Sequence, residues 1–266
     1  MKPLIDDDFW AIVQPLLPPP KPRRFDHPGR LPVGDREVLT GIAFVLKTGI
    51  GWDDLPAELG WGWGCGKTCR QRLRTWQRLG VWDRIRAEIL ARLNKAGEID
   101  WRRGSIDSGS VRSPGGGAMT GPNPTDRRKL GSKHHILVDG RGIPLAATTT
   151  GANRHDSQAF IPLLDALVGV GGKPGRRRRF PDEILGDRAY DSEALRRASR
   201  DRRIRPRLAK RNTPHGSGLG VFRWPVERTI SWLHRFRRLG YRRDRLLPIH
   251  EAFLTLGCAL IAFRFL

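Results

Sequence analysis

The chain has 266 residues, 38% of them hydrophobic, with a formal net charge of +22 and a sequence pI of about 11.4. A chain of this length and content has a real core, as one large domain or two smaller ones. Its three cysteines are too few for a disulfide framework, and the apolar run at 252–263 is shorter than the roughly 20 residues that cross a bilayer. Composition therefore excludes a disulfide-stapled domain and a membrane-spanning protein, and it fits a reducing cytosol.

The positive charge is concentrated in the C-terminal part of the chain. Residues 1–100 hold 16 Lys and Arg against 13 Asp and Glu, whereas residues 101–266 hold 33 against 14. A field of this sign attracts polyanions, of which DNA and RNA are the commonest. A ribosomal-type or merely soluble basic protein would show the same balance, but we expect nucleic acid as the partner.

The first hundred residues show the hydrophobic spacing of short helices. Apolar residues recur at helical spacing in Asp35–Thr48, and Thr68–Leu79 begins at a capping threonine. The predicted helices are Asp6–Leu17, Asp35–Thr48, Thr68–Leu79 and Val81–Leu93, with a loop at Lys21–Pro32 and a turn at Gly51–Pro56. Residues 1–98 are therefore predicted to form a small all-helical domain.

After Gly97 the pattern changes to short β-type runs that later alternate with helices. The predicted strands are Ser105–Val111, His134–Val138, Ile143–Thr150, Glu183–Leu185 and, more weakly, Ile204–Leu208. The predicted helices are Ser157–Leu167, Ser192–Arg200 and two more that start near Trp224 and His250. This order is typical of an α/β layer on a mixed sheet, so residues 99–266 are predicted to form a second domain.

Two of the predicted helices, Asp35–Thr48 and Thr68–Leu79, would form a helix-turn-helix-like unit, although their link is longer than the usual turn. In the second helix, Cys69, Leu73 and Trp76 would face inward. The outward side chains suited to phosphates and base edges are Arg70, Gln71, Arg74 and Arg78. The alternative is a solvated basic helix on a packing domain.

Three carboxylates stand in settings that suit metal ligands. Asp107 lies in a predicted strand, Asp187 directly follows a short apolar strand, and Glu227 lies near a helix start. Two divalent ions about 3.5–4 Å apart can activate a nucleophile and stabilise a leaving oxygen in phosphodiester chemistry. Because such hard ions prefer oxygen ligands, the three carboxylates predict metal-dependent chemistry on nucleic acid.

Helical geometry groups several basic residues with Glu227. Since residues advance by about 100° each, Arg223, His234 and Arg238 fall within about 40° of Glu227 on one helix face. These side chains would contact phosphates. The alternative is that Arg223 and Glu227 form an ordinary ion pair four residues apart, worth about 0.2–0.5 kcal/mol.

Four other polar residues allow two interpretations each. Lys133 and His134 lie at a strand start near the proposed site, and they either contact DNA or simply begin the strand. Asp156 and Asp191 lie near strand ends, where a carboxylate could bind metal. Each of these two is more simply the N-terminal cap of the helix that follows.

Several segments, in order along the chain, match one known family. They are Arg36–Ile42, Thr48–Pro56, Arg74–Trp82, Ile106–Ser108, Gly131–His135, Gly151–Asp156, Gly186–Ser192 and Arg223–Thr229. On these segments the chain resembles bacterial insertion-sequence transposases of the DDE type, in the insertion-sequence-five group, over essentially its whole length. Such ordered matches are far more specific than any single motif.

The family's signature around the glutamate is Tyr, two residues, Arg, three residues, Glu, six residues, and Lys or Arg. Arg223 and Glu227 match it. Gly220 stands at the tyrosine position, and His234 stands at the distal basic position with Arg235 beside it. These departures bear on the binding of element ends and leave the metal ligands intact.

The resemblance implies an RNase H-like catalytic domain with two Mg²⁺ or Mn²⁺ ions held by Asp107, Asp187 and Glu227. It implies hydrolysis of DNA at the terminal inverted repeats, followed by attack of the freed 3′-OH on target DNA, by a homo-oligomer assembled on DNA. A catalytically inactive or repurposed transposase that only binds DNA and a plain RNase H-like nuclease are the alternatives. All three acidic residues and the helical part are present, so we expect an active transposase.

Overall fold

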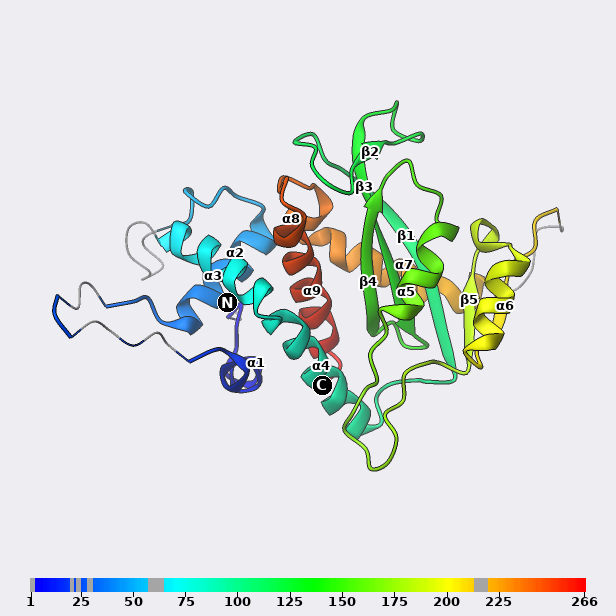
Figure 1. Ribbon diagram of the computed structural model, residues 1–266, viewed down its shortest axis with the longest axis horizontal. Coiled ribbons are helices and arrows are strands. Elements are labelled where there is room, and N and C mark those ends of the chain that lie inside the picture. Colours follow the sequence, from blue (N-terminus) through cyan, green and yellow to red (C-terminus); the bar gives the residue numbers. More distant parts are fainter. Residues whose placement is uncertain (1–2, 20–21, 23–24, 28–30, 57–64, 213–219) are drawn as a thin grey trace.

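The structure, a computed structural model, describes residues 3–19, 22, 25–27, 31–56, 65–212 and 220–266. The described part of the chain forms a group of helices beside a β-sheet that carries further helices on both faces (Figure 1). Half of the residues of the loop predicted at Lys21–Pro32 lie outside the described residues.

The helical group is close to the prediction. It contains α1 (Asp7–Val13), the 3-10 turn η1 (Gln14–Leu16), α2 (Asp35–Thr48), α3 (Cys65–Arg78) and α4 (Val81–Ala96). Gly49 ends α2 in the left-handed conformation, with φ at 72°. Cys69, Leu73 and Trp76 of α3 are buried, so the predicted inner face of this helix is confirmed.

In the described part of the chain the sheet has six strands that run in both directions. They are β1 (Arg103–Arg112), β2 (Gly121–Pro122), β3 (Leu130–Asp139), β4 (Pro144–Gly151), β5 (Glu183–Gly186) and β6 (Arg205–Leu208). β1 is central, because it pairs antiparallel with β3 and parallel with β5. β4 pairs antiparallel with β3, and β6 pairs parallel with β5. The predicted mixed α/β layer is confirmed, whereas the two-residue β2 is too short for any periodicity to predict.

Helices cover both faces of this sheet (Figure 1). α5 (Ser157–Asp165) and α6 (Glu193–Asp201) lie on one face, while α7 (Gly220–Arg235) and α9 (Leu247–Phe263) lie on the other. Two short elements, η3 (Arg188–Tyr190) and α8 (Arg237–Gly240), follow β5 and α7. Because successive strand residues point to opposite faces, Asp107 and Gly109 of β1 meet α7 while Ser108 meets the start of α5.

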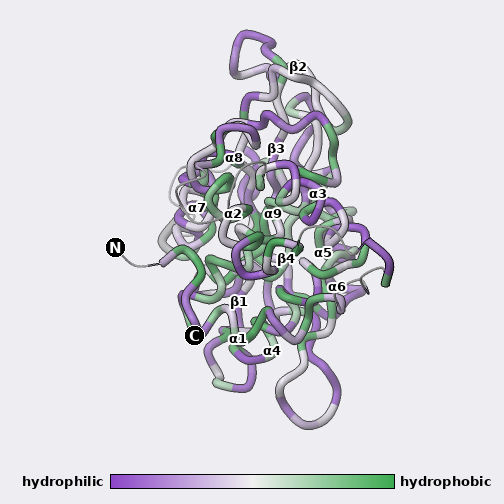
Figure 2. Tube along the Cα trace, turned by 90° about the vertical axis from the view of Figure 1, so that its left-hand side faces the viewer, coloured by the Kyte–Doolittle hydropathy of each residue, from purple (hydrophilic) through white to green (hydrophobic). Residues whose placement is uncertain are grey.

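α9 joins the helical group to the sheet. It packs against α3 and α4 on one side and against β4 and α7 on the other. Figure 2 shows its hydrophobic residues at the centre of the molecule, with hydrophilic segments around the outside. One hydrophobic core therefore runs through both predicted domains, and their division between residues 98 and 99 stays a prediction. None of the helices that the structure describes is long and apolar enough to cross a membrane.

The helix that carries Glu227 begins and ends earlier in the chain than predicted. α7 ends at Arg235, and the chain turns at Phe236 before α8 begins. Arg238 is therefore buried, and its guanidinium donates two hydrogen bonds of 2.9 Å to the Asp244 carboxylate. The predicted place of Arg238 beside Glu227 is wrong, because periodicity within a basic run does not reveal where a helix breaks.

The contact between β1 and α7 depends on Gly109. A Cβ atom at this position would lie 2.6 Å from Cε1 of His234 and 2.8 Å from Cγ2 of Ile230, both on α7. β1 carries Asp107 and α7 carries Glu227. The missing side chain at residue 109 therefore sets how closely these two carboxylates approach.

We expect Gly109→Ala to lower the free energy of unfolding by about 1–3 kcal/mol, because the added methyl group overpacks this contact. Urea or thermal unfolding measures the change. Gly171→Ala is the matched control, since an added Cβ there comes no closer than 3.8 Å to a neighbouring atom. Equal stability of the two variants would contradict the role given to Gly109.

Candidate active site

Asp107 lies in β1, and Asp187 directly follows the parallel neighbour β5 at the same height along the strands. β1 and β5 are in register at Ser105 and Leu185, and each aspartate lies two residues beyond its strand's register position. Parallel strands rise equally along the chain, so equal offsets place both residues at one edge of the sheet. Two carboxylates far apart in the sequence are thus brought to adjacent strands.

Backbone and side-chain donors orient both carboxylates. Asp187 caps the η3 turn by accepting a 2.9 Å hydrogen bond from the amide of Ala189. Asp107 accepts a 2.8 Å hydrogen bond from the amide of Ser108 on Oδ1 and a 3.0 Å hydrogen bond from Arg223 on Oδ2. Each carboxylate is therefore held by donors that the fold fixes locally.

α7 brings one cation and one further carboxylate to this edge. Arg223 forms an ion pair with Asp107 in which the two side chains are only 16% and 20% exposed. Glu227, one turn later on the helix, is exposed. In the described structure Arg223 thus pairs across to the strand, and the alternative of an ordinary Arg223–Glu227 pair on the helix surface is not the arrangement found.

The three carboxylates share one electrostatic environment. Burial raises the pKa of Asp107 above its ordinary value, and the Ser108 amide and the Arg223 guanidinium oppose that rise. The negative charges of Asp187 and Glu227 then raise the pKa of Asp107 further. A nearby cation would relieve this excess of negative charge.

The donor set suits a hard divalent cation, because all three groups offer carboxylate oxygens. Among the residues that the structure describes, however, no three Asp, Glu, His or Cys side chains stand at metal-ligand spacing. Arg223 occupies one oxygen of Asp107 instead. In the described arrangement a protein cation, the Arg223 guanidinium, therefore pairs with Asp107.

The two aspartates predicted as helix caps do not cap. Asp156 holds the N-cap position of α5 but makes no capping hydrogen bond. Asp191 precedes Ser192, which is the N-cap residue of α6, and its carboxylate accepts from the side chain of Arg196 and the amide of Arg211. The prediction that the side chains of Asp156 and Asp191 cap helices is therefore wrong.

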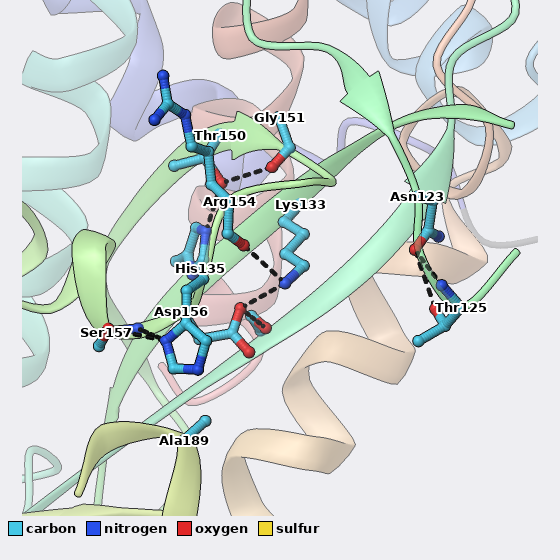
Figure 3. A network of polar contacts seen from close by, with 12 residues as sticks. Asn123, Thr125, Lys133, His135, Thr150, Gly151, Arg154, Asp156, Ser157 and Ala189 are labelled. Carbon is cyan, nitrogen blue, oxygen red and sulfur yellow. Dashed lines mark hydrogen bonds and ion pairs between the residues drawn. The ribbon is translucent and has the colours of Figure 1, made fainter. Parts of the chain in front are cut away.

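Asp156 belongs instead to a polar network that includes Lys133 and Arg154 (Figure 3). Its Oδ1 accepts hydrogen bonds of 2.9 Å from the Ser108 hydroxyl and from Nζ of Lys133. Lys133 also donates to the carbonyl of Arg154, and its side chain is only 15% exposed. Burial raises the pKa of Asp156, but the bonds from Lys133 and Ser108 lower it more, so the net shift is downward. Asp156 and Lys133 were both candidate site residues from the sequence, but the ion pair between them was not predicted.

His134 and His234 lie in a buried cluster with His250. Nδ1 of His134 is 3.3 Å from Nε2 of His234, and Nε2 of His134 is 2.8 Å from Nε2 of His250. Burial lowers the pKa of all three imidazoles, that of His250 to about 3. His134 is wholly buried and thus part of the strand's packing. His234 is half-buried and stands where the family signature has Lys or Arg.

The predicted outer face of α3 lies beside two hollows in the surface. Its exposed members are Arg70, Gln71, Arg74 and Arg78. A hollow of about 680 Å³ is lined by Trp52, Arg70, Gly117, Arg238, Arg243, Asp244, Arg245, Leu246 and Ile249. A second, of about 510 Å³, is lined by Gln71, Arg74, Thr75, Gln77, Arg78, Leu246, Pro248, Ile249 and Glu251. Both lie between α3 and the start of α9.

Two family models match the chain in sequence order. The model described as "Putative transposase of IS4/5 family" matches residues 5–86, and the model described as "Transposase DDE domain" matches residues 102–262. The chain belongs to the DDE transposases of the IS4/5 family. Its mixed sheet lies in the stretch that the transposase DDE domain model matches, a helical region precedes it, and the function of the chain is that of a DNA transposase.

The chain is similar to two curated transposases and, distantly, to one solved structure. The "Putative transposase for insertion sequence element IS402" of Burkholderia cepacia is 55% identical over 163 residues, which are 61% of this chain and 75% of that protein. Its counterpart for element IS6501 of Brucella ovis is 27% identical over 140 residues, which are 50% of this chain and 98% of that protein. A solved Mos1 transposase paired-end complex with left transposon end covers 89% of this chain and 81% of its own at 13% identity, with a TM-score of 0.27.

We expect Asp156→Asn to slow DNA strand cleavage by about 10–100-fold, as for other partners that orient metal-binding side chains. The change removes the charge that holds Lys133 and loosens Ser108, whose amide orients Asp107. Cleavage of end-bearing DNA measures the effect. Asp165→Asn, at the exposed end of α5, is the control, and equal rates for both variants would rule out the positioning role.

Proposed function

We propose that Asp107, Asp187 and Glu227 are the catalytic triad with which this transposase cuts DNA at the ends of its element and joins the freed 3′-OH to target DNA. The observation that carries the proposal is the partly buried carboxylate of Asp107, which pairs with Arg223 and lies close enough to Asp187 and Glu227 for their charges to raise its pKa. These groups come from a central strand, a parallel neighbour and a helix. DNA is a polyanion, so a site that cuts it needs cations beside the phosphate. The three carboxylates would bind those cations.

The same three residues would hold two Mg²⁺ or Mn²⁺ ions. Bound there, such ions would activate the attacking oxygen and stabilise the leaving oxygen of the phosphodiester. The chain's own part is to aim the ligands, through the Ser108 amide on Asp107 and the Ala189 amide on Asp187. Arg223 pairs with Asp107 in the described arrangement, and it would bind a phosphate oxygen if a divalent ion were held by Asp107 instead.

We further propose that residues 1–98 are the end-binding domain and residues 99–266 the catalytic domain. The exposed face of α3 would bind the terminal inverted repeats, with Arg70, Gln71, Arg74 and Arg78 directed to phosphates and base edges. Arg243 and Arg245 stand on the far side of the neighbouring hollow and would bind the DNA backbone. Two or more copies would act together on paired ends, in the cytoplasm at the bacterial nucleoid.

The triad is tested by strand cleavage on linear DNA that carries the terminal inverted repeats of the source element, with Mg²⁺ and with Mn²⁺. We expect Asp107→Asn to abolish metal-dependent nicking at the repeat tip while DNA binding persists, because the isosteric amide removes a metal ligand and keeps the shape. Binding by both proteins without cleavage by either would instead indicate a repurposed DNA-binding protein.

The α3 surface is tested by the salt dependence of DNA binding. We expect the double variant Arg74→Gln, Arg78→Gln to weaken binding and to lower the slope of log K against log salt by about 1–2, because each lost phosphate contact removes close to one unit. Arg92→Gln, an exposed arginine on α4 outside both hollows, should leave the slope unchanged. Identical slopes for the two proteins would exclude α3 as the DNA-binding face.

A further inference from the structure

Tyr190 carries a buried hydroxyl group without a partner. The residue is 1% exposed, and its Oη forms no hydrogen bond with any residue that the structure describes. Buried hydroxyl groups are almost always hydrogen-bonded, because burial removes the water that would otherwise bind them. An exception of this kind needs an explanation, such as a group that binds there.

The ring of Tyr190 is held in one place. Its amide donates to the carbonyl of Asp187 at 3.1 Å, which closes the η3 turn. The ring packs against Phe160 of α5 with centroids 5.7 Å apart, and a Cβ atom on Gly186 would lie 3.0 Å from its Cδ2. The hydroxyl group therefore cannot swing away to find solvent or another partner.

The surroundings of the hydroxyl group are those of the candidate active site. The charged groups that act on it are Asp156, Asp107, Asp187 and Arg223. Burial and the charges of Asp156, Asp107 and Asp187 raise the pKa of Tyr190 well above its ordinary value, so the hydroxyl group stays protonated and is a hydrogen-bond donor. A fixed donor thus stands among acidic groups and bonds to none of them.

We propose that the Tyr190 hydroxyl group donates a hydrogen bond to an oxygen atom of a ligand bound at the candidate active site. Two ligands offer such an oxygen: a water molecule of a hydrated divalent cation and a non-bridging oxygen of a DNA phosphate. This proposal rests on the proposed function, since it needs Asp107, Asp187 and Glu227 to hold a cation, or Arg223 to hold a phosphate, at this site. It assigns Tyr190 a role in binding and orientation and no role as a nucleophile.

The test is Tyr190→Phe, which removes the hydroxyl group and keeps the ring packed on Phe160 and Gly186. The matched control is Tyr241→Phe, because Tyr241 is the chain's other tyrosine and is 41% exposed. The full chain is measured by thermal unfolding without metal and by calorimetric titration with Mn²⁺ alone. Its affinity for end-bearing DNA is measured with EDTA present, and strand cleavage is measured as a function of Mn²⁺ concentration.

We expect Tyr190→Phe to unfold at the same temperature as the native chain, or higher, when metal is absent, because the lost group has no partner to lose. If the acceptor is a water of the hydrated cation, Mn²⁺ affinity falls about tenfold and half-maximal cleavage needs correspondingly more Mn²⁺. If it is a DNA phosphate, affinity for DNA in EDTA falls about tenfold while Mn²⁺ affinity is unchanged. Tyr241→Phe matches the native chain throughout.

Three results would overturn the proposal. A metal-free unfolding temperature several degrees below native would mean that the hydroxyl group has a structural partner within the protein. Unchanged Mn²⁺ affinity, DNA affinity and cleavage would mean that it touches no ligand. A native chain that neither binds Mn²⁺ nor cuts DNA would refute the proposed function first, whereas Asp107-dependent cleavage that ignores Tyr190 would refute this inference alone.

Discussion

The close packing of α7 on β1 is the constraint on which the candidate site depends. A strand places a carboxylate accurately, but a helix adds a third group only if it approaches the sheet closely. Gly109 permits that approach, and two residues earlier on the same face Asp107 pairs with Arg223 of α7. The packing contact and the ion pair lie on one strand face, so they fix both the distance and the register of the helix. Glu227 follows Arg223 by about one turn and takes its position from them.

Among the described residues around the candidate site, two carboxylates form ion pairs with basic side chains and two do not. Asp107 has Arg223, and Asp156 has Lys133. For Asp187 and Glu227 the described part of the chain provides no ion pair within 4 Å. Removing one member of a buried pair is costly, so the paired carboxylates are structural as well as chemical. The unpaired ones supply the negative charge that a divalent cation would need, in a chain whose overall field already attracts DNA.

Much of the fold followed from periodicity. The helices α2, α3 and α4 and the strands β1, β3 and β4 have apolar spacings long enough to identify, and they lie within a few residues of the predicted ranges. The break between α7 and α8 could not be predicted, because the residues around Phe236 are basic and continue a helical pattern. The turn at Phe236 is accompanied by tertiary contacts, in which Arg238 donates hydrogen bonds to Asp244 and to the carbonyl of Ile50.

The candidate site, like the fold, could be predicted from the sequence only in part. Asp107, Asp187 and Glu227 could be named because each stands at a recognisable place on a strand or helix. The partners of Asp156 could not, since Ser108 and Lys133 are 48 and 23 residues away and only strand pairing brings them together. The histidine cluster is hidden for a similar reason, since its three members come from β3, α7 and α9. Local preference assigns a role to one residue at a time, whereas these groups act through contacts between elements.

The histidine cluster also links the two functions that the chain must combine. His250 lies on α9 next to Ile249, which lines both hollows beside α3, and it contacts His134 on the strand paired with β1. His134 in turn contacts His234 of α7, one turn past Ile230 and two past Glu227. The cluster is therefore a side-chain connection between α9, which borders both hollows, and the helix of Glu227. If a duplex binds beside α3 as proposed, this cluster lies between that surface and the carboxylates.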